Sequence, residues 1–330
     1  MSTPPEQPPE LPEAGVRVSL RYLRPPGSAP PMGDVVGHLV ASGPLVRVRS
    51  ADGVVHEFRH SDVLYVRRLT DRPVKNSAIR AVEHAAALAW PGSEHQWLDG
   101  WLLRAGPGAD LTANSAVPLD MFAHANTIPA IIDWYEQRYL PAYLAVPERL
   151  LRLSEDIPTR LETRTLVCDI AAAQPAPDDV LAAAEPGADW LAVYRGHNEA
   201  APVEVLTAVV DGEVVFVSIP GVAVGRGTVT AGPDGSRWLG VTAVRVSADQ
   251  RRQGHGRRIC DALRAWGADR GATRGYAHVP TGGSASLDEG ETKLGPPLRP
   301  SDPGVFGFFE AAGFAGQHRT RYIDSRMLLG

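Results

Sequence analysis

The chain of 330 residues has little cysteine and no long apolar run. Its two cysteines, Cys168 and Cys260, lie far apart, and neither belongs to a metal-like cluster. This pattern argues against a disulfide framework and favours a reducing compartment. No apolar run approaches the roughly 18 residues that a membrane-spanning helix needs. We therefore expect a cytoplasmic protein with no membrane segment and no metal site.

An excess of charge of one sign is also lacking, because the net charge is −5 at pH 7. A protein built to coat nucleic acid would be strongly basic, so nucleic acid is not expected as a partner. One segment departs from this balance. Between Arg245 and Arg274, eight arginines stand against three aspartates and give a local charge of +5. An anionic ligand is therefore expected there.

The length and a hydrophobic content of 44% predict two or three ordinary globular domains. Residues 1–14, rich in Pro and Glu, predict a disordered leader rather than a signal peptide. Residues 15–70 hold five short segments, of which the first alternates with Val18 and Leu20 on its apolar side. An Asp-Gly hairpin turn and the lack of helical periodicity add to this pattern, which predicts a small SH3-like β-barrel.

Two later regions, residues 74–172 and 188–330, repeat one order of elements. Each has short strands, a helix with a late tryptophan, a strand that ends in Val-Pro, a short helix and a basic strand. One divergent duplication would explain this order, although common packing needs could also produce it. In the second region short turns join three strands, which predicts antiparallel neighbours. In the first region we expect helices at residues 77–89 and, more briefly, at 148–153.

A glycine-rich loop, RRQGHGR at residues 251–257, follows the third of these strands and opens a helix. A helix start offers unpaired backbone N–H groups and positive dipole charge, so it attracts phosphate. Glycine lets the backbone approach an anion, and arginine adds charge-assisted contacts. The loop therefore predicts a cradle for a phosphate or pyrophosphate. It is neither a Walker loop nor a dinucleotide fingerprint, because it has no Gly-Lys-Ser/Thr and no third glycine at position 259.

The spacing Arg251-x-x-Gly254-x-Gly256 resembles the acetyl-CoA loop of the GCN5-related N-acetyltransferases, the GNAT family. The surrounding order is similar too, from an antiparallel meander to a short helix that ends in Gly-Phe. The resemblance implies an α+β fold, the GNAT acyl-CoA N-acyltransferase fold, in which helices flank a mixed, splayed sheet. The whole chain further resembles actinobacterial acetyltransferases with an SH3-like N-terminal domain, a degenerate middle half and an active C-terminal half.

The resemblance also implies where acetyl-CoA, the co-substrate, would bind. The strand before the loop would pair its main chain, at Val244 and Val246, with the pantetheine arm, much as an added strand would. Phe309 would also lie against the cofactor. The pyrophosphate would lie on the loop, whose members are Arg251, Arg252, Gln253, Gly254, His255, Gly256 and Arg257.

Acetyl transfer needs a neutral amine, a polarised thioester carbonyl and a proton for the leaving thiolate. The family often supplies that proton from a tyrosine, but Phe309 occupies its position and cannot donate one. The family's asparagine seven residues earlier corresponds to Asp302. Substitutes are His278 as a base and Tyr276 or Tyr322 as a proton donor, although each of them also fits a packing role. The catalytic residues are left open at this point.

An insert between Pro280 and Pro300 falls where the rim of the active site is expected. The chain is thus expected to transfer an acetyl group from acetyl-CoA to a primary amine, directly within a ternary complex. The acceptor stays open among a protein lysine, a protein N-terminus, a polyamine, an aminoglycoside and an amino acid. The alternative is a non-catalytic acyl-CoA-binding or protein-interaction module, and the sequence indicates no oligomeric state.

Overall fold

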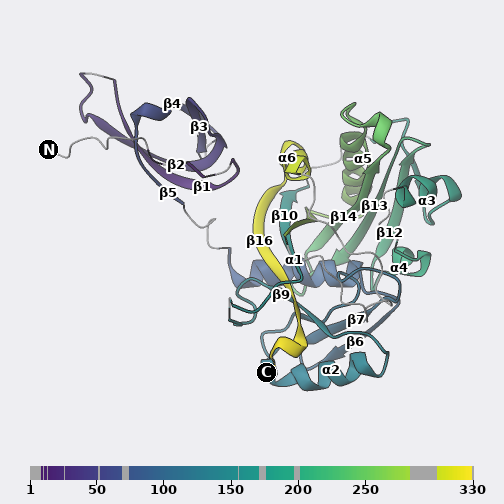
Figure 1. The fold of residues 1–330 in the computed structure, drawn as a ribbon. Helices are drawn as coiled ribbons and strands as arrows, with labels where there is room; N and C mark the ends of the chain where they lie inside the picture. The colour runs from purple at the N-terminus through teal and green to yellow at the C-terminus, as the bar shows by residue number, and fades with distance from the viewer. Residues whose placement is uncertain are drawn as a thin grey trace. The chain divides into compact units, whose positions relative to one another are not determined.

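The structure, a computed structural model, divides into two compact units, Met1–Pro73 and Val74–Gly330 (Figure 1). It describes residues 9, 11–12, 14–25, 27–50, 53–68, 74–154, 156–170, 176–196, 201–282 and 303–328. Most of the leader expected at residues 1–14 therefore lies outside the described residues. None of the described helices is long and apolar enough to cross a membrane.

The first unit is a five-stranded sheet in the order β4-β3-β2-β1-β5. Its elements are β1 (Arg17–Leu23), β2 (Met32–Ala41), β3 (Leu45–Ser50), β4 (Val55–Arg59), the 3-10 helix η1 (His60–Asp62) and β5 (Val63–Arg68). The predicted alternation of the first strand is confirmed, because Val18 and Leu20 are fully buried and their neighbours are not. These side chains meet Leu39, Val46 and Phe58 in a core of their own. The unit is all-β, as predicted.

The second unit has an eight-stranded sheet in the order β11-β12-β13-β14-β15-β10-β16-β9 and a three-stranded sheet, β6-β7-β8. The larger sheet holds β9 (Tyr143–Pro147), β10 (Leu161–Asp169), β11 (Leu181–Ala183), β12 (Glu213–Ile219), β13 (Ala223–Ala231), β14 (Arg237–Val246), β15 (Arg274–Gly282) and β16 (Ala315–Asp324). The smaller sheet holds β6 (Glu94–Leu98), β7 (Trp101–Ala105) and β8 (Val117–Pro118). The meander from β12 to β14 is antiparallel, as its short turns predicted.

Helices cover both faces of the larger sheet. They are α1 (Asn76–Ala89), α2 (Ile128–Glu136), α3 (Ala188–Arg195), α4 (Val203–Thr207), α5 (His255–Asp269) and α6 (Pro303–Ala311), with 3-10 turns η2 (Ala125–Thr127), η3 (Ala248–Gln250) and η4 (Ser325–Leu328). On one face, Ile259 of α5 and Phe309 of α6 share a core with Leu239. On the other face, α1 packs against Trp238 and Tyr276. The two faces differ because successive strand residues point to opposite sides.

The larger sheet mixes strands from both predicted regions (Figure 1). β10, from residues 74–172, lies between β15 and β16, which belong to residues 188–330. A parallel pairing of two backbone segments that a helix separates in the chain occurs at two places. β14 pairs in parallel with β15 across α5, and a parallel bridge from Ala116 to Leu144 joins the start of β8 to β9 across α2. The duplication and the boundaries of the two halves stay predictions.

The short helix predicted for residues 148–153 is wrong. After Pro147 the chain makes a turn in which Arg149 has a φ of 68°. A left-handed φ does not fit a right-handed helix. Leu151 and Leu153 pack against the core beneath α2, which explains why this segment is apolar.

Candidate functional site

The site begins where the parallel strands β14 and β15 separate. The two strands pair over three residues each, 238–240 with 274–276. Further along β14, Ala243 and Val244 together oppose Gly225 of β13, and Ala243 has a φ of 51°. Such a β-bulge bends and twists its strand. Within the described sheet, the end of β14 therefore turns away from β15 and opens a gap between them.

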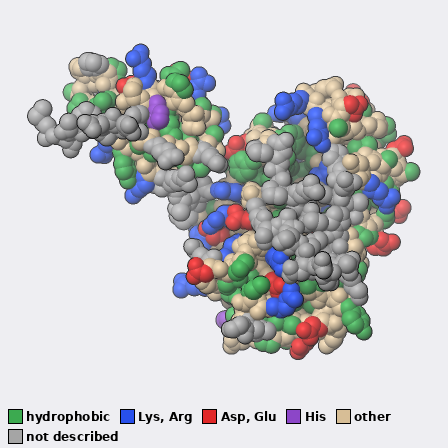
Figure 2. Space-filling view, in the orientation of Figure 1, with side chains coloured by type: hydrophobic (Ala, Val, Ile, Leu, Met, Phe, Trp, Pro, Cys, Tyr) green, Lys and Arg blue, Asp and Glu red, His purple; other side chains and the backbone are tan. Residues whose placement is uncertain are grey.

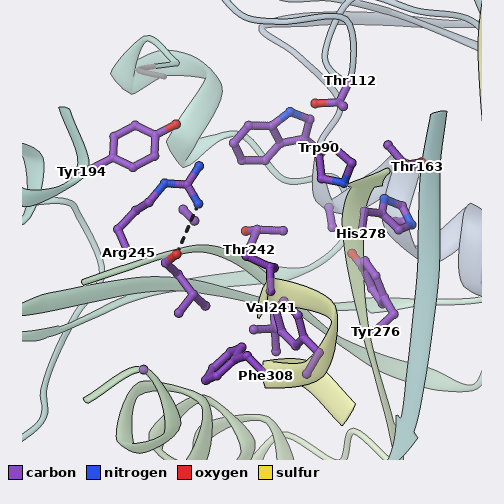
Figure 3. A pocket seen from close by; sticks show the side chains of 18 of the residues that line it. Trp90, Thr112, Thr163, Tyr194, Val241, Thr242, Arg245, Tyr276, His278 and Phe308 are labelled. Carbon is purple, nitrogen blue, oxygen red and sulfur yellow. Dashed lines mark hydrogen bonds between the residues drawn. The ribbon is translucent and has the colours of Figure 1, made fainter. Parts of the chain in front are cut away.

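A cavity of about 710 Å³ lies at this gap. Its walls include residues of α1 and the residue after it, β14, the loop before α5, β15 and α6, together with Tyr194 of α3 and Tyr322 of β16. In Figure 3, Tyr276 and His278 lie on one side of the cavity, Trp90 and Tyr194 on another, and Phe308 near its base. The cavity thus connects the start of α5 with the face of the sheet that α1 covers.

Helix α5 starts at the cavity without a side-chain cap among the described residues. Its N-cap residue, Gly254, has a φ of 84°, and Arg252 two residues earlier has a φ of 61°. Glycine adopts this left-handed conformation at little cost, and here it turns the loop into the helix. The first backbone N–H groups of a helix have no partner within it. Without a cap, those of α5 are open to an anion.

The two loop glycines are needed for different reasons. A Cβ atom on Gly254 would meet no atom within 4 Å, so the left-handed φ alone favours glycine there. A Cβ atom on Gly256 would lie 3.2 Å from the ring of Phe308, which is tighter than ordinary contact. Gly256 therefore makes room for α6, whereas the sequence had suggested that both glycines make room for the ligand.

All members of the predicted loop but one reach the cavity. Those that line it are Arg251, Arg252, Gly254, His255, Gly256 and Arg257, and Gln253 does not. Residues outside the cavity lining hold Arg257, because its Nη1 donates to Ala311 O at 3.1 Å and its Nε lies 3.7 Å from Asp261. On the face shown in Figure 2, Lys and Arg side chains gather at the end of the second unit that carries α5 and α6. This charge suits an anionic ligand.

The positions expected to meet pantetheine also line the cavity. Val244 and Val246 do so from β14, and Arg245 Nη1 donates to Val244 O at 3.2 Å (Figure 3). Phe309 contributes to the lining, but its ring is buried and packs edge-on against Phe314 at 5.3 Å. Phe309 is therefore mainly a core residue at the edge of the cavity.

The structure brings the three catalytic candidates, His278, Tyr276 and Tyr322, to this one cavity. Burial raises the pKa of Tyr276 and of Tyr322, so both phenols keep their protons at neutral pH. The hydroxyl of Tyr276 lies over Gly240, where a Cβ atom would come within 2.4 Å of it. The structure therefore holds both phenols protonated at the cavity.

Sequence reasoning missed Glu83, a buried carboxylate that α1 brings to the cavity. Its Oε1 atom lies 2.9 Å from His318 Nε2, 3.4 Å from His278 Nε2 and 3.0 Å from Thr165 Oγ1. Burial opposes the ionisation of Glu83, but the two histidines outweigh it, so the pKa of this carboxyl lies well below its usual range. The sequence did contain a local clue, because Glu83 is a charged residue within the buried stripe formed by Ile79, Val82 and Ala86.

Neither cysteine joins the site. Cys168 and Cys260 are buried, and burial raises the pKa of Cys260 to about 12, so it offers no thiolate at neutral pH. Among the described residues, no group of three or more His, Cys, Asp or Glu is arranged to hold a metal ion. Asp302 and the part of the insert at residues 283–300 lie outside the described residues.

An antiparallel meander, a splayed parallel pair and a glycine loop that opens a helix together define a GNAT acetyltransferase fold. A GCN5-related N-acetyltransferase from Kribbella flavida is similar, with 14% identity, a TM-score of 0.46, and coverage of 76% of this chain and 96% of that one. An acetyltransferase described as putative, from Novosphingobium aromaticivorans, gives 16% identity, a TM-score of 0.46, and coverage of 76% and 97%.

Comparison of sequences gives the family directly. The model of the C-terminal region of the probable histone acetyltransferase Rv0428c matches residues 76–295, and that of its N-terminal Sm-like domain matches residues 12–67. The Mycobacterium tuberculosis protein of that name is 49% identical over 316 residues, which cover 96% of each chain. The chain therefore belongs to this family of GNAT acetyltransferases, and it is an acetyltransferase. Its first unit, expected as an SH3-like barrel, is the family's Sm-like domain.

Proposed function

We propose that the protein transfers an acetyl group from acetyl-CoA to a primary amine by direct attack within a ternary complex. The observation that carries the proposal is one continuous cavity. It joins the uncapped start of α5 to the gap between β14 and β15, and it continues to the face that holds His278. A phosphate-binding end and a titratable end in one cavity suit a cofactor that carries a reactive thioester.

The residues present fit acetyl-CoA. The open space beside Gly254 and the N–H groups of the first turn of α5 would take the pyrophosphate, with Arg252 at the rim. The edge of β14 at Val244 and Val246, which β15 leaves at the gap, would pair with the pantetheine arm. Bound acetyl-CoA supplies an activated acetyl carbonyl, and the protein supplies its orientation and the handling of protons.

The acceptor amine is proposed from chemistry and from the family. A primary amine is a suitable nucleophile, because a base that acts at neutral pH can remove its proton. The relative from Mycobacterium tuberculosis is named a probable histone acetyltransferase, which favours a protein lysine among the possible acceptors. A protein N-terminus, a polyamine, an aminoglycoside and an amino acid are the acceptors against which lysine peptides should be compared.

A matched pair of variants tests the cofactor site. Asp and Asn tolerate a left-handed φ better than other non-glycine residues, and at Gly254 both have open space for the side chain. Only Asp adds a negative charge where the pyrophosphate would lie. One charge-assisted contact is worth roughly 1.5–3 kcal/mol, so we expect Asp to bind acetyl-CoA about tenfold to two hundredfold more weakly than Asn. Equal affinities by titration calorimetry, with both variants folded, would contradict this placement.

A further inference from the structure

Three polar side chains form a row across the middle of the larger sheet. Thr165 of β10 lies opposite His278 of β15 on one side and opposite His318 of β16 on the other. Residues at paired positions share one face of a sheet. This face is the one on which α1 packs, and Glu83 is the α1 residue that meets the row. The register of three strands and one helix thus builds the cluster.

The two histidines of the row differ in what they can reach. The His318 side chain is 0% exposed, and its Nδ1 lies 2.9 Å from Gln317 Oε1. The His278 side chain is 25% exposed and lines the cavity. Its Nε2 atom is buried and faces Glu83 Oε1 at 3.4 Å, so the exposure belongs to the remainder of the ring. Of the two rings, His278 is the one that a substrate can meet.

We propose that His278 is the general base of the transfer and that Glu83 is its positioning residue. The inference rests on the acetyl transfer proposed above. An ionised carboxylate only accepts hydrogen bonds, so Glu83 favours the tautomer of His278 that carries hydrogen on Nε2. The lone pair of Nδ1 is then the one available to the acceptor.

Glu83 is itself held in place. Thr165 Oγ1 donates to its Oε1 at 3.0 Å, and His318 Nε2 contacts the same oxygen at 2.9 Å. Burial of this carboxylate strengthens its interactions, because the local dielectric is low. Among the described residues, the groups that face His278 are Glu83 from α1, Thr165 from β10, His318 beyond Glu83, and Tyr276, whose ring lies 5.5 Å away on the same strand.

In the proposed transfer, the acceptor arrives as an ammonium ion, and Nδ1 of His278 takes one of its protons. The freed nitrogen lone pair forms a bond to the thioester carbonyl carbon. The C–S bond then breaks, and its electron pair leaves with the sulfur of CoA. A second proton leaves the nitrogen and ends on that sulfur, which gives the N-acetyl amine, free CoA thiol and protonated His278.

This assignment gives the predicted degenerate half a chemical role. Glu83 and Thr165 come from residues 74–172, whereas His278 and His318 come from residues 188–330. His278 therefore has its partners Glu83 and Thr165 only when α1 and β10 lie against the strands of the second half. The first half supplies part of the active site in addition to packing surface.

The test is the pH dependence of kcat/KM in the full chain, measured by release of CoA thiol with the best acceptor amine. His278→Gln should lower kcat/KM by about 10²–10⁴, the usual contribution of a general base. Glu83→Gln should lower it by a smaller factor and change its pH dependence, because the ring loses its negative neighbour. Glu83→Asp, which keeps the charge, should retain the wild-type pH dependence. In all three variants the KM for acetyl-CoA should stay close to the wild-type value.

The matched control is Glu310→Gln, the same change at an exposed glutamate of α6, which should leave rate and pH profile unchanged. Added imidazole should restore turnover in His278→Ala. This rescue tests the base assignment even if a Glu83 variant fails to fold. Wild-type rates and profiles in folded His278 and Glu83 variants would overturn the base assignment while the acetyltransferase function stands. No turnover by the wild type with any amine would overturn both the function and the base.

Discussion

In related enzymes one tyrosine often both packs against its neighbours and donates a proton, whereas the buried ring of Phe309 only packs. It packs edge-on against Phe308 and Phe314, at 5.1 and 5.3 Å between ring centroids, and has no hydroxyl to offer a leaving thiolate. Tyr276 and Tyr322 line the same cavity in their protonated forms. Phe309 therefore preserves the aromatic packing of α6, and a proton for the leaving thiolate would have to come from another group or from water.

Restoring a hydroxyl at Phe309 is predicted to speed turnover. A lost general acid typically costs about 10²–10⁴ in rate, so the wild type should be slow and Phe309→Tyr faster, with acetyl-CoA affinity little changed. Steady-state thiol release measures the effect. Phe314→Tyr is the control, because Phe314 belongs to the core but not to the cavity lining. A folded Phe309→Tyr variant with wild-type turnover would show that a missing acid does not limit the rate.

The local sequence predicted single helices and strands, but it did not predict which elements lie side by side in the structure. Helix α1 matches its predicted range of 77–89 apart from one added residue, because an alanine-rich, 3.6-residue period is a local signal. The glycine loop before α5 was likewise readable from spacing. The insertion of β10 between β15 and β16 was not, because alternation marks a strand without naming its partner.

The same limit explains which part of the site was missed. His278 was a candidate from its strand alone, but its partner Glu83 lies on a helix almost 200 residues earlier in the chain. Glu83 stands out only when α1 is drawn as a helix, because a charge then falls within an apolar stripe. What that charge meets depends on the order of the sheet, which the pattern of one segment does not contain.

Glu83 should also affect how α1 is held on the sheet at acidic pH. Its pKa is lowered on folding, so the ionised carboxylate adds stability above its unfolded pKa of about 4.3, and this stability is lost as the pH falls further. We expect the free energy of unfolding to fall more steeply between about pH 5 and 3 in the wild type than in Glu83→Gln. Urea unfolding at several pH values measures this difference. Parallel curves for the two proteins would contradict the buried ion pair.

At the scale of the whole molecule, the cavity lies within the second unit and draws on both of its halves. α1 contributes Glu83 and Trp90 follows it, while β14, β15 and the loop before α5 contribute the wall where acetyl-CoA is proposed to bind. The Sm-like unit has a core and a charge pattern of its own. Its surface arginines are partly neutralised within the unit, since Arg47 pairs with Glu57 and Arg21 with Asp34.

The most direct test of the central claim is the product formed by the full chain from acetyl-CoA and an amine. Free CoA thiol and acetylated amine should be measured together, by a thiol reagent and by mass spectrometry, over histone peptides, polyamines, aminoglycosides and amino acids. We predict that at least one acceptor raises thiol release above the rate without amine, and that N-acetyl product and thiol form in equal amounts. Binding of acetyl-CoA with no amine-dependent thiol release for any acceptor would contradict the account and favour an acyl-CoA-binding module.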